Sequence, residues 1–561
     1  MTYRNFGPST LLALGLIIVT ATMPLCPAAA QQAPEPSAII ALAPIDEQLK
    51  DVEYLAAATS EMAGNMSGMA RLQAEGFMPG VDFSKSSGAL LYFTEGQTEP
   101  NAIGFFPVTE LEDVLDKISE FAEIEEEADI INILPDNGEQ LSLKSQGNYA
   151  FVSDKPELLK NLPADPAGMV ADQAKNYNAS AIIYPQRIPE ELRQQAIELI
   201  RQGFESQMDQ LDELSADIQE AQFDLQMRQM EMMVNEFEKV TIGLGIDKDA
   251  KRVFVDTKMK GVDNSDMSKR LIASKTTEPT KFAGFLMENA AMTMHNCSGI
   301  SPEDAKMYVD AFDNIRDVML DEIVEESEED KAAVLTKITN QLSSVIKKTL
   351  NNGLMDMGGV IFTENGLNAT FAAQIADARS LETSIKEIVD ETKSELADKG
   401  IVFELNSGSH SGFNLHKISI ALQVDELDDA VEQMLGDKVN VILGINNTQV
   451  YVAVGKDPEA TLKKSIDANA NASPSNKPDI LGQYNFFMTP IMKMAASMQD
   501  EEMIEAMSDE ISESGQDRIR FSYDVKDDEM TFRFETQDGI FKMLGIFGEF
   551  MGGMAGGGAD F

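Results

Sequence analysis

The chain has 561 residues, too many for one compact core, so its length predicts two or three domains. Hydrophobic residues make up 43% of it, which excludes wholesale disorder. Asp and Glu number 94 against 45 Lys and Arg, for a formal net charge of −49. Such a chain repels nucleic-acid phosphates and anionic lipid surfaces, and no stretch of the sequence is dense enough in Lys and Arg to form a basic patch. We therefore expect no nucleic-acid partner.

Residues 1–30 have the layout of a secretory signal peptide. Arg4 is the only charged side chain before Gln31, an apolar run extends from Leu11 to Met23, and small residues follow at 28–30. We expect cleavage after residue 30 and an exported protein, in the periplasm, the cell envelope or the extracellular space. The apolar run is shorter than the roughly 20 residues of a membrane helix, which disfavours the alternative of an uncleaved anchor.

Cleavage would leave Cys297 as the only cysteine, so no internal disulfide can form. Cys26 does not fit a lipoprotein signal, because Leu25 precedes it where a small residue is expected. No later segment approaches 18 uninterrupted apolar residues, so we expect no membrane span after signal cleavage. Cys297 itself is either a reactive thiol or a plain, partly buried residue.

Four pairs of segments match in the same order along the chain and predict an internal duplication. Each pair reads as the same run of strands, turns or helix. Residues 149–157 and 451–459, for example, read as a strand, a turn and a helix opened by Pro-Glu. The other pairs are 88–118 with 359–388, 181–185 with 484–490, and 240–257 with 519–536, the last being a hairpin with one buried face.

The predicted fold class is α+β, with two repeated units joined by a helical connector. Each unit is expected to be an antiparallel sheet with helices on one face, because hairpins recur and regular βαβ alternation does not. The predicted boundaries are 1–30 for the signal peptide, 31–275 for the N-terminal unit, 276–355 for the connector, 356–547 for the C-terminal unit and 548–561 for a Gly-rich tail.

One very long helix is expected in the first unit, at about 189–239. Its apolar residues follow a helical period, with one phase shift near residue 220. Such a helix would be around 75 Å long and would have to fold back on itself, pack on the other unit or reach a partner. Methionines cluster in it, at Met227, Met230, Met232 and Met233. They are either ordinary core filler or the lining of an adaptable apolar groove.

Familiar catalytic and metal-binding patterns are missing from the sequence. The three histidines, His295, His410 and His416, lie too far apart in the chain to form a structural zinc site with Cys297. No HExxH, GxSxG or P-loop pattern occurs. Residues 344–347 read S-x-x-K, but they lie in an amphipathic pattern without the companion motifs of that enzyme class. We therefore assign no catalytic, cofactor-binding or metal residue.

The strand–turn–Pro-Glu–helix unit, the signal peptide and the repeated α+β body together resemble uncharacterised exported bacterial proteins built from tandem strand–helix units. The resemblance covers most of the chain after residue 30. That family has no assigned activity, so the resemblance implies no functional residues.

Three functions are compatible with the sequence. The first is a non-catalytic binding or scaffolding protein that acts through its sheet faces or its long helix on an unknown protein partner. The second is a carrier of an apolar ligand in a Met-lined groove between the units. The third is a hydrolase that uses two converging acidic residues. The first is the leading hypothesis because no motif supports the other two.

Overall fold

The structure is a computed structural model that describes residues 35–546 apart from several short segments. The predicted signal peptide and Gly-rich tail lie outside the described residues. The other segments outside them are 60, 98, 136–137, 209–222, 224–226, 277, 327–328, 365, 399, 422–433, 435–437, 473–479 and 499–501.

The described chain is mixed α+β with extensive antiparallel sheet, which confirms the predicted class. Its contacts divide it into two compact units. Unit 1 comprises the chain up to Ala57, Glu61–Ala196 and Glu238–Lys248. Unit 2 comprises Ala58–Ser60, Ile197–Phe237 and the chain from Asp249 onward.

The sheet of unit 1 has the strand order β9-β8-β1-β2-β3-β7-β6-β5-β4, and every neighbouring pair is antiparallel. Its strands are β1 (Ala38–Leu42), β2 (Ser87–Tyr92), β3 (Asn101–Pro107), β4 (Ala122–Glu127), β5 (Ile130–Pro135), β6 (Leu141–Gln146), β7 (Tyr149–Ser153), β8 (Ala179–Ile183) and β9 (Phe237–Asp247).

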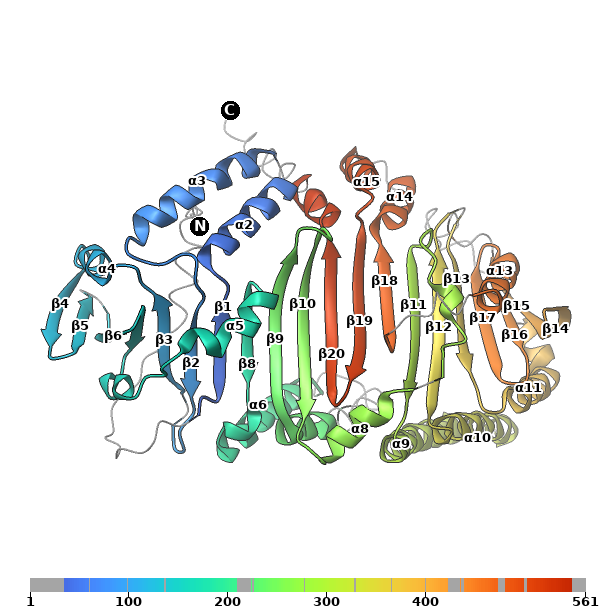
Figure 1. Cartoon of the computed structure of the whole chain (residues 1–561). Helices are drawn as coiled ribbons and strands as arrows, with labels where there is room; N and C mark the ends of the chain where they lie inside the picture. Colours follow the sequence, from blue (N-terminus) through green and yellow to red (C-terminus); the bar gives the residue numbers. More distant parts are fainter. Residues whose placement is uncertain are drawn as a thin grey trace, which may run out of the picture. The chain divides into compact units, whose positions relative to one another are not determined.

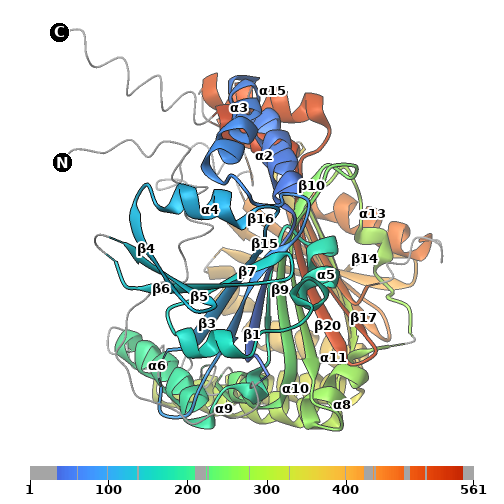
Figure 2. The same cartoon turned by 60° about the vertical axis from the view of Figure 1, so that its left-hand side comes forward.

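Unit 1 has a core on each face of its sheet. On one face, Phe105 and Phe151 pack with Leu159 of the short helix η1 (Pro156–Lys160) and Val170 of α5 (Pro166–Asn176). On the other face, α4 (Leu111–Ile118) covers the strands toward β4 through Val114. Figure 2 shows α4 and α5 on opposite sides of the strands. The helices α2 (Ile45–Thr59) and α3 (Glu61–Phe77) follow β1.

The sheet of unit 2 has the strand order β10-β20-β19-β18-β11-β12-β13-β17-β16-β15-β14, again antiparallel throughout (Figure 1). Its strands are β10 (Arg252–Gly261), β11 (Met292–Gly299), β12 (Leu354–Phe362), β13 (Asn368–Gln374), β14 (Ile401–His410), β15 (Phe413–Ala421), β16 (Lys438–Ile445), β17 (Gln449–Gly455), β18 (Gly482–Phe487), β19 (Arg518–Lys526) and β20 (Glu529–Gln537).

Helices lie on both faces of the unit 2 sheet as well. On one face, Tyr451 packs against Phe282 and Phe285 around the short helix η3 (Ala283–Phe285), and against Leu462 of α13 (Pro458–Ala470). On the opposite face, α11 (Ala378–Asp398) packs on β14 and β16. The prediction of helices on one face of each sheet is therefore wrong, because each sheet has separate apolar strips that need cover on opposite sides.

The other helices are α8 (Asp266–Ser274), α9 (Pro302–Glu326), α10 (Glu329–Asn351), α14 (Met488–Met498) and α15 (Glu502–Ser514).

The predicted long helix at 189–239 is not one straight helix. Helix α6 spans Glu190–Met208, and β9 already begins at Phe237. Arg201 of α6 forms an ion pair with Glu231 at 3.2 Å, and Ile197 packs with Met227. Thirty residues of straight helix would separate the first two by about 45 Å. The helical stretches on either side of 209–222 therefore pack against each other, while 209–222 itself lies outside the described residues.

Two other predicted segments differ in detail from the structure. Residues 276–355, predicted as a helical connector, contain α9 and α10 but also β11, which pairs with β12 and β18 in unit 2. Pro458 opens helix α13 as expected, with the Asp457 side chain accepting a hydrogen bond from the Ala460 amide. Pro156 opens only a short 3₁₀ helix, because the chain turns again before α5 begins at Pro166.

The packing of α13 gives the first test of the fold. Leu462 of α13 is fully buried and packs in one core with residues of η3 and of the sheet. We expect Leu462→Ala to lower the free energy of unfolding by about 3 kcal/mol, through lost apolar burial and the cavity left behind. Leu544→Ala, at a side chain that is 54% exposed, is the control and is expected to change it by less than about 0.5 kcal/mol. Urea unfolding followed by circular dichroism measures both, and equal effects would contradict this packing.

Candidate binding surface

The strand register of unit 2 places one set of apolar side chains on a single face of the sheet. Side chains alternate between the two faces of a strand, and directly paired residues share a face. We call this set the apolar face. It consists of Val253 and Val255 of β10, Met530, Phe532 and Phe534 of β20, Ile519, Phe521 and Tyr523 of β19, Tyr484 and Phe486 of β18, Met292 and Met294 of β11, Met357 and Ile361 of β12, and Phe371 of β13.

Aromatic rings of the apolar face are exposed although they contact one another. Phe521 is 47% exposed and Phe532 40%. The ring of Phe521 lies 4.9 Å from that of Phe534 and 6.3 Å from that of Phe486, and the rings of Tyr523 and Phe532 are 5.9 Å apart. Rings at these separations attract each other, but much of their surface still faces solvent. Folded monomers rarely expose continuous apolar patches larger than roughly a few hundred Å², and patches above that size mark interaction sites.

Two glycines make the apolar face flatter. A side chain at Gly359 would come within 2.6 Å of the Phe371 ring, and one at Gly482 within 2.0 Å of the Tyr523 ring. The rings therefore lie over the backbone of the neighbouring strand instead of standing away from the sheet. Burial raises the pKa of Tyr523 to about 12, so this phenol stays neutral and the face carries no charge there.

Helices flank the strands that carry the apolar face. Figure 1 shows α14 and α15 at one end of β18 and β19, and α9 and α10 at the other end of β11 and β12. Along the sheet, α11 covers the same face at β14–β16, where its Glu382 accepts a hydrogen bond from Asn414 of β15. The apolar face is thus the part of this side that lies between the flanking helices.

The opposite face of the same strands is polar and ion-paired. Glu535, only 1% exposed, accepts hydrogen bonds from Arg252 at 2.8 Å and Arg518 at 3.1 Å. The buried Asp256 receives two bonds from Arg533, at 2.6 and 2.7 Å. Bidentate arginine–carboxylate pairs of this kind are strong and directional.

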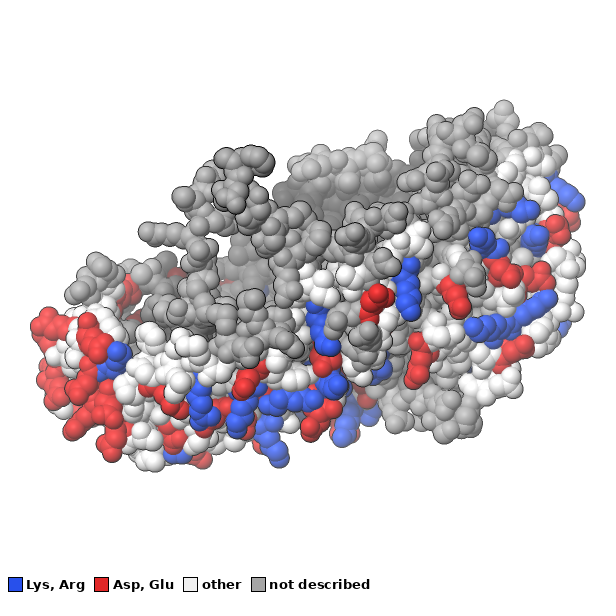
Figure 3. All heavy atoms as spheres, turned by 90° about the horizontal axis from the view of Figure 1, so that it is seen from above, with Lys and Arg blue, Asp and Glu red and all other residues white. Residues whose placement is uncertain are grey.

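This polar network continues across the sheet toward β11. Arg520 donates from Nε to Oδ1 of Asn485 at 2.9 Å, and Asn485 donates to the Thr293 hydroxyl at 2.9 Å. Arginines that are far apart in the sequence thus gather on one face, which no local count of Lys and Arg could predict. In unit 1, by contrast, acidic side chains gather at the β4 end, whose sequence is AEIEEE (Figure 3).

The only cysteine among the described residues, Cys297, is buried on the polar side of β11. Its side chain donates to the carbonyl oxygen of Glu278 at 3.5 Å. Burial, together with the nearby carboxylates of Asp356 and Glu278, raises the pKa of the thiol to about 12. A thiol with this pKa is protonated at neutral pH, and a protonated thiol is a poor nucleophile. The structure therefore favours the plain buried residue.

The three histidines occupy separate places. His295 is buried on β11, and burial lowers its pKa to about 4. His410 lies 2.8 Å from Asp467, whereas the buried His416 lies 3.3 Å from Glu382. Among the described residues, no three His, Cys, Asp or Glu side chains are placed to hold a metal ion.

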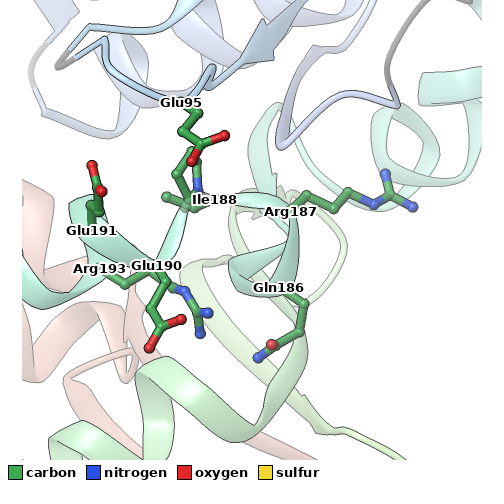
Figure 4. A pocket seen from close by; sticks show the side chains of 8 residues that line it. Glu95, Gln186, Arg187, Ile188, Glu190, Glu191 and Arg193 are labelled. Carbon is green, nitrogen blue, oxygen red and sulfur yellow. The ribbon is translucent and has the colours of Figure 1, made fainter.

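The S-x-x-K pattern and the open pocket of unit 1 show no catalytic geometry. Lys347 forms an ion pair with Asp313 of α9. A pocket of about 450 Å³ is lined by Glu95, residues 186–191 and Arg193. In Figure 4 its charged side chains point in different directions, and Arg187 turns away to stack over the Tyr184 ring at 3.9 Å.

Comparisons with protein-family models, with curated protein sequences and with solved structures found no match for this chain. Within the described residues, no helix has the length and apolar character needed to cross a membrane.

The sequence indicated the apolar face only in part. Residues 519–525 and 530–534 alternate apolar and polar side chains, which predicted a hairpin with one buried face. The alternation is present, but Phe521, Phe532 and Phe534 on the apolar side are 37–47% exposed, whereas Asp256 and Glu535 on the polar side are buried. Alternation in a single strand cannot show whether another element covers it, so this surface could not be identified from sequence.

His295 predicts a dependence of stability on pH. Its pKa is about 4 in the folded protein against 6.5 ordinarily, so between these values only the unfolded chain takes up the proton. Stability from this group is therefore present above pH 6.5 and is lost as the pH falls toward 4, at up to about 1.4 kcal/mol per pH unit. In urea unfolding at about pH 7, 6 and 5, the stability of His295→Gln should decline less steeply with falling pH than that of the wild type. Parallel declines would contradict the assignment.

Cys297 predicts slow alkylation. At pH near 8, a pKa of about 12 instead of 9 lowers the thiolate fraction by about a thousandfold. We expect iodoacetamide to label the folded protein more than about a hundredfold more slowly than the urea-unfolded protein. Mass spectrometry of timed samples measures both rates, and similar rates would show that this thiol is accessible and reactive.

Proposed function

We propose that this is a non-catalytic binding protein whose binding surface is the apolar face of unit 2. The observation that carries the proposal is the exposure of Phe521, Phe532 and Phe534 on strands whose other face is closed by ion pairs. Covering such rings removes apolar surface from water and is worth about 25 cal/mol for each Å². A ligand or partner that covers the face gains this free energy.

The methionines of the apolar face also support its proposed role as the binding surface. Met292, Met294, Met357 and Met530 lie on the apolar face, where flexible thioethers can adapt to different ligand shapes. The methionines of the predicted long helix differ in exposure, since Met233 is 37% exposed. Met227 is only 2% exposed and packs with Ile197 and Phe223, as core filler does.

We also propose that the chain is an internal duplication. The order β9-β8-β1-β2-β3-β7-β6-β5-β4 in unit 1 corresponds, strand for strand, to β19-β18-β11-β12-β13-β17-β16-β15-β14 in unit 2. The segments matched by sequence fall on corresponding strands, for example 149–157 on β7 and 451–459 on β17. Ile242 and Leu244 of β9 are exposed, and they correspond in position to Phe521 and Tyr523 of β19.

Export is part of the proposal and is supported by the layout of residues 1–30. An exported binding protein that has one cysteine after signal cleavage depends on its packed cores for stability, because it has no disulfide.

Binding of the neutral dye Nile red to the mature protein tests the proposed surface. We expect the double variant Phe521→Thr/Phe534→Thr to reduce the dye fluorescence at least about fivefold, because it removes two contacting rings. Threonine keeps the β-propensity of both positions. The control is Ile272→Ser, at an apolar side chain of α8 that is 54% exposed and lies outside the apolar face.

Circular dichroism confirms that each variant is folded. The control should bind the dye as the wild type does. Equal dye binding by the wild type and the double variant would contradict the proposed surface.

A further inference from the structure

We infer that the ligand of the apolar face is a long-chain amphiphile, whose acyl chain lies on this face while its polar head stays in solvent. The inference rests on the proposed function and adds the chemical class of the ligand.

The backbone groups of these strands are engaged in pairing within the sheet. Strands β20, β19, β18, β11 and β12 are each paired on both sides. An extended peptide laid on this face would bury its own N–H and C=O groups without partners, at a cost of roughly 1–3 kcal/mol for each group. An acyl chain has no such groups, so it gains the apolar contact without that penalty.

Charge disfavours two other occupants. None of the residues that define the apolar face is charged, so the face offers nothing to an ionic group. The whole chain carries −49, so two copies joined through this face would combine a formal charge of 2 × −49 = −98. The same charge opposes docking onto an anionic bilayer. A single amphiphile brings little or no charge with its chain.

The face is large enough for a whole acyl chain. From β10 to β13 it spans seven neighbouring strands. Neighbouring strands lie about 4.8 Å apart, so the six intervals cover about 29 Å. One leaflet of a bilayer holds its acyl chains in about 15 Å, half of the hydrocarbon core. A membrane-lipid chain therefore fits across the strands with room to spare.

The chemistry of the lining suits a chain of variable conformation. The rings of Phe371 and Tyr523 lie over Gly359 and Gly482, and Phe371 is 38% exposed, so its ring offers flat aromatic surface. Methionines at Met292, Met294 and Met357 lie beside them. Such a surface can follow the bends of a flexible hydrocarbon but gives little selectivity for a rigid ligand.

Competition with Nile red on the mature protein tests this inference. The competitors are palmitate, lysophosphatidylcholine and hexanoate, each below its micelle concentration, and a peptide that forms an amphipathic helix. We expect a long-chain competitor to displace the dye at a concentration at least about tenfold lower than hexanoate does, because the binding free energy grows with the number of CH₂ groups that are buried. The variants Phe521→Thr/Phe534→Thr and Ile272→Ser are measured in parallel, and the first should lose long-chain binding while the second keeps it.

The outcomes separate the inference from the proposed function. Displacement by palmitate alone identifies a free fatty acid, displacement by lysophosphatidylcholine alone identifies a phospholipid, and displacement by both shows that the chain is what is recognised. If the dye binds the wild type and not the double variant, yet neither long-chain competitor displaces it, the inference is overturned and the proposed function stands. Displacement by the helical peptide alone also overturns the inference, in favour of a protein partner. Equal dye binding to wild type and double variant overturns the proposed function itself.

Discussion

The ion pairs of Asp256 with Arg533 and of Glu535 with Arg252 and Arg518 determine which side of the unit 2 sheet is polar. Side chains in a strand alternate, so a slip of one residue would move every ring to the other face. These carboxylates are almost fully buried, and breaking one pair would leave a buried charge without its partner. The pairs therefore hold the register of β10, β20 and β19, and with it the position of Phe521, Phe532 and Phe534.

The buried cores of the two units do not include the exposed rings of the apolar face. Each unit buries a separate core, under η1 and α5 in unit 1 and under η3 and α13 in unit 2. Phe151 and Tyr451 lie in these cores and are buried, whereas Phe521 is not. Rings that lie outside these cores can remain exposed and accessible to a ligand. This separation is typical of binding proteins, in which a rigid scaffold positions a surface that forms its main contacts only in the complex.

Local sequence patterns predicted the strands better than they predicted what covers them. The hairpin expected at 519–536 is present as β19 and β20, and the helix after Asp457 begins at Pro458. Alternation and capping act within a few residues, so they can be read directly from the chain. The return of the chain after α6 depends instead on the packing of Ile197 against Met227, and the polar network depends on Arg252 meeting Glu535. Contacts between residues so far apart leave no local pattern in the sequence.

The acidic composition has a physical role beside the exposed rings. A face with aromatic side chains 37–47% exposed is an aggregation hazard, because two copies could bury it against each other. A net charge of −49 opposes that encounter at long range, since each copy repels the next before the apolar surfaces meet. The excess of Asp and Glu thus opposes self-association through the apolar face, which leaves the exposed rings accessible to the proposed amphiphile.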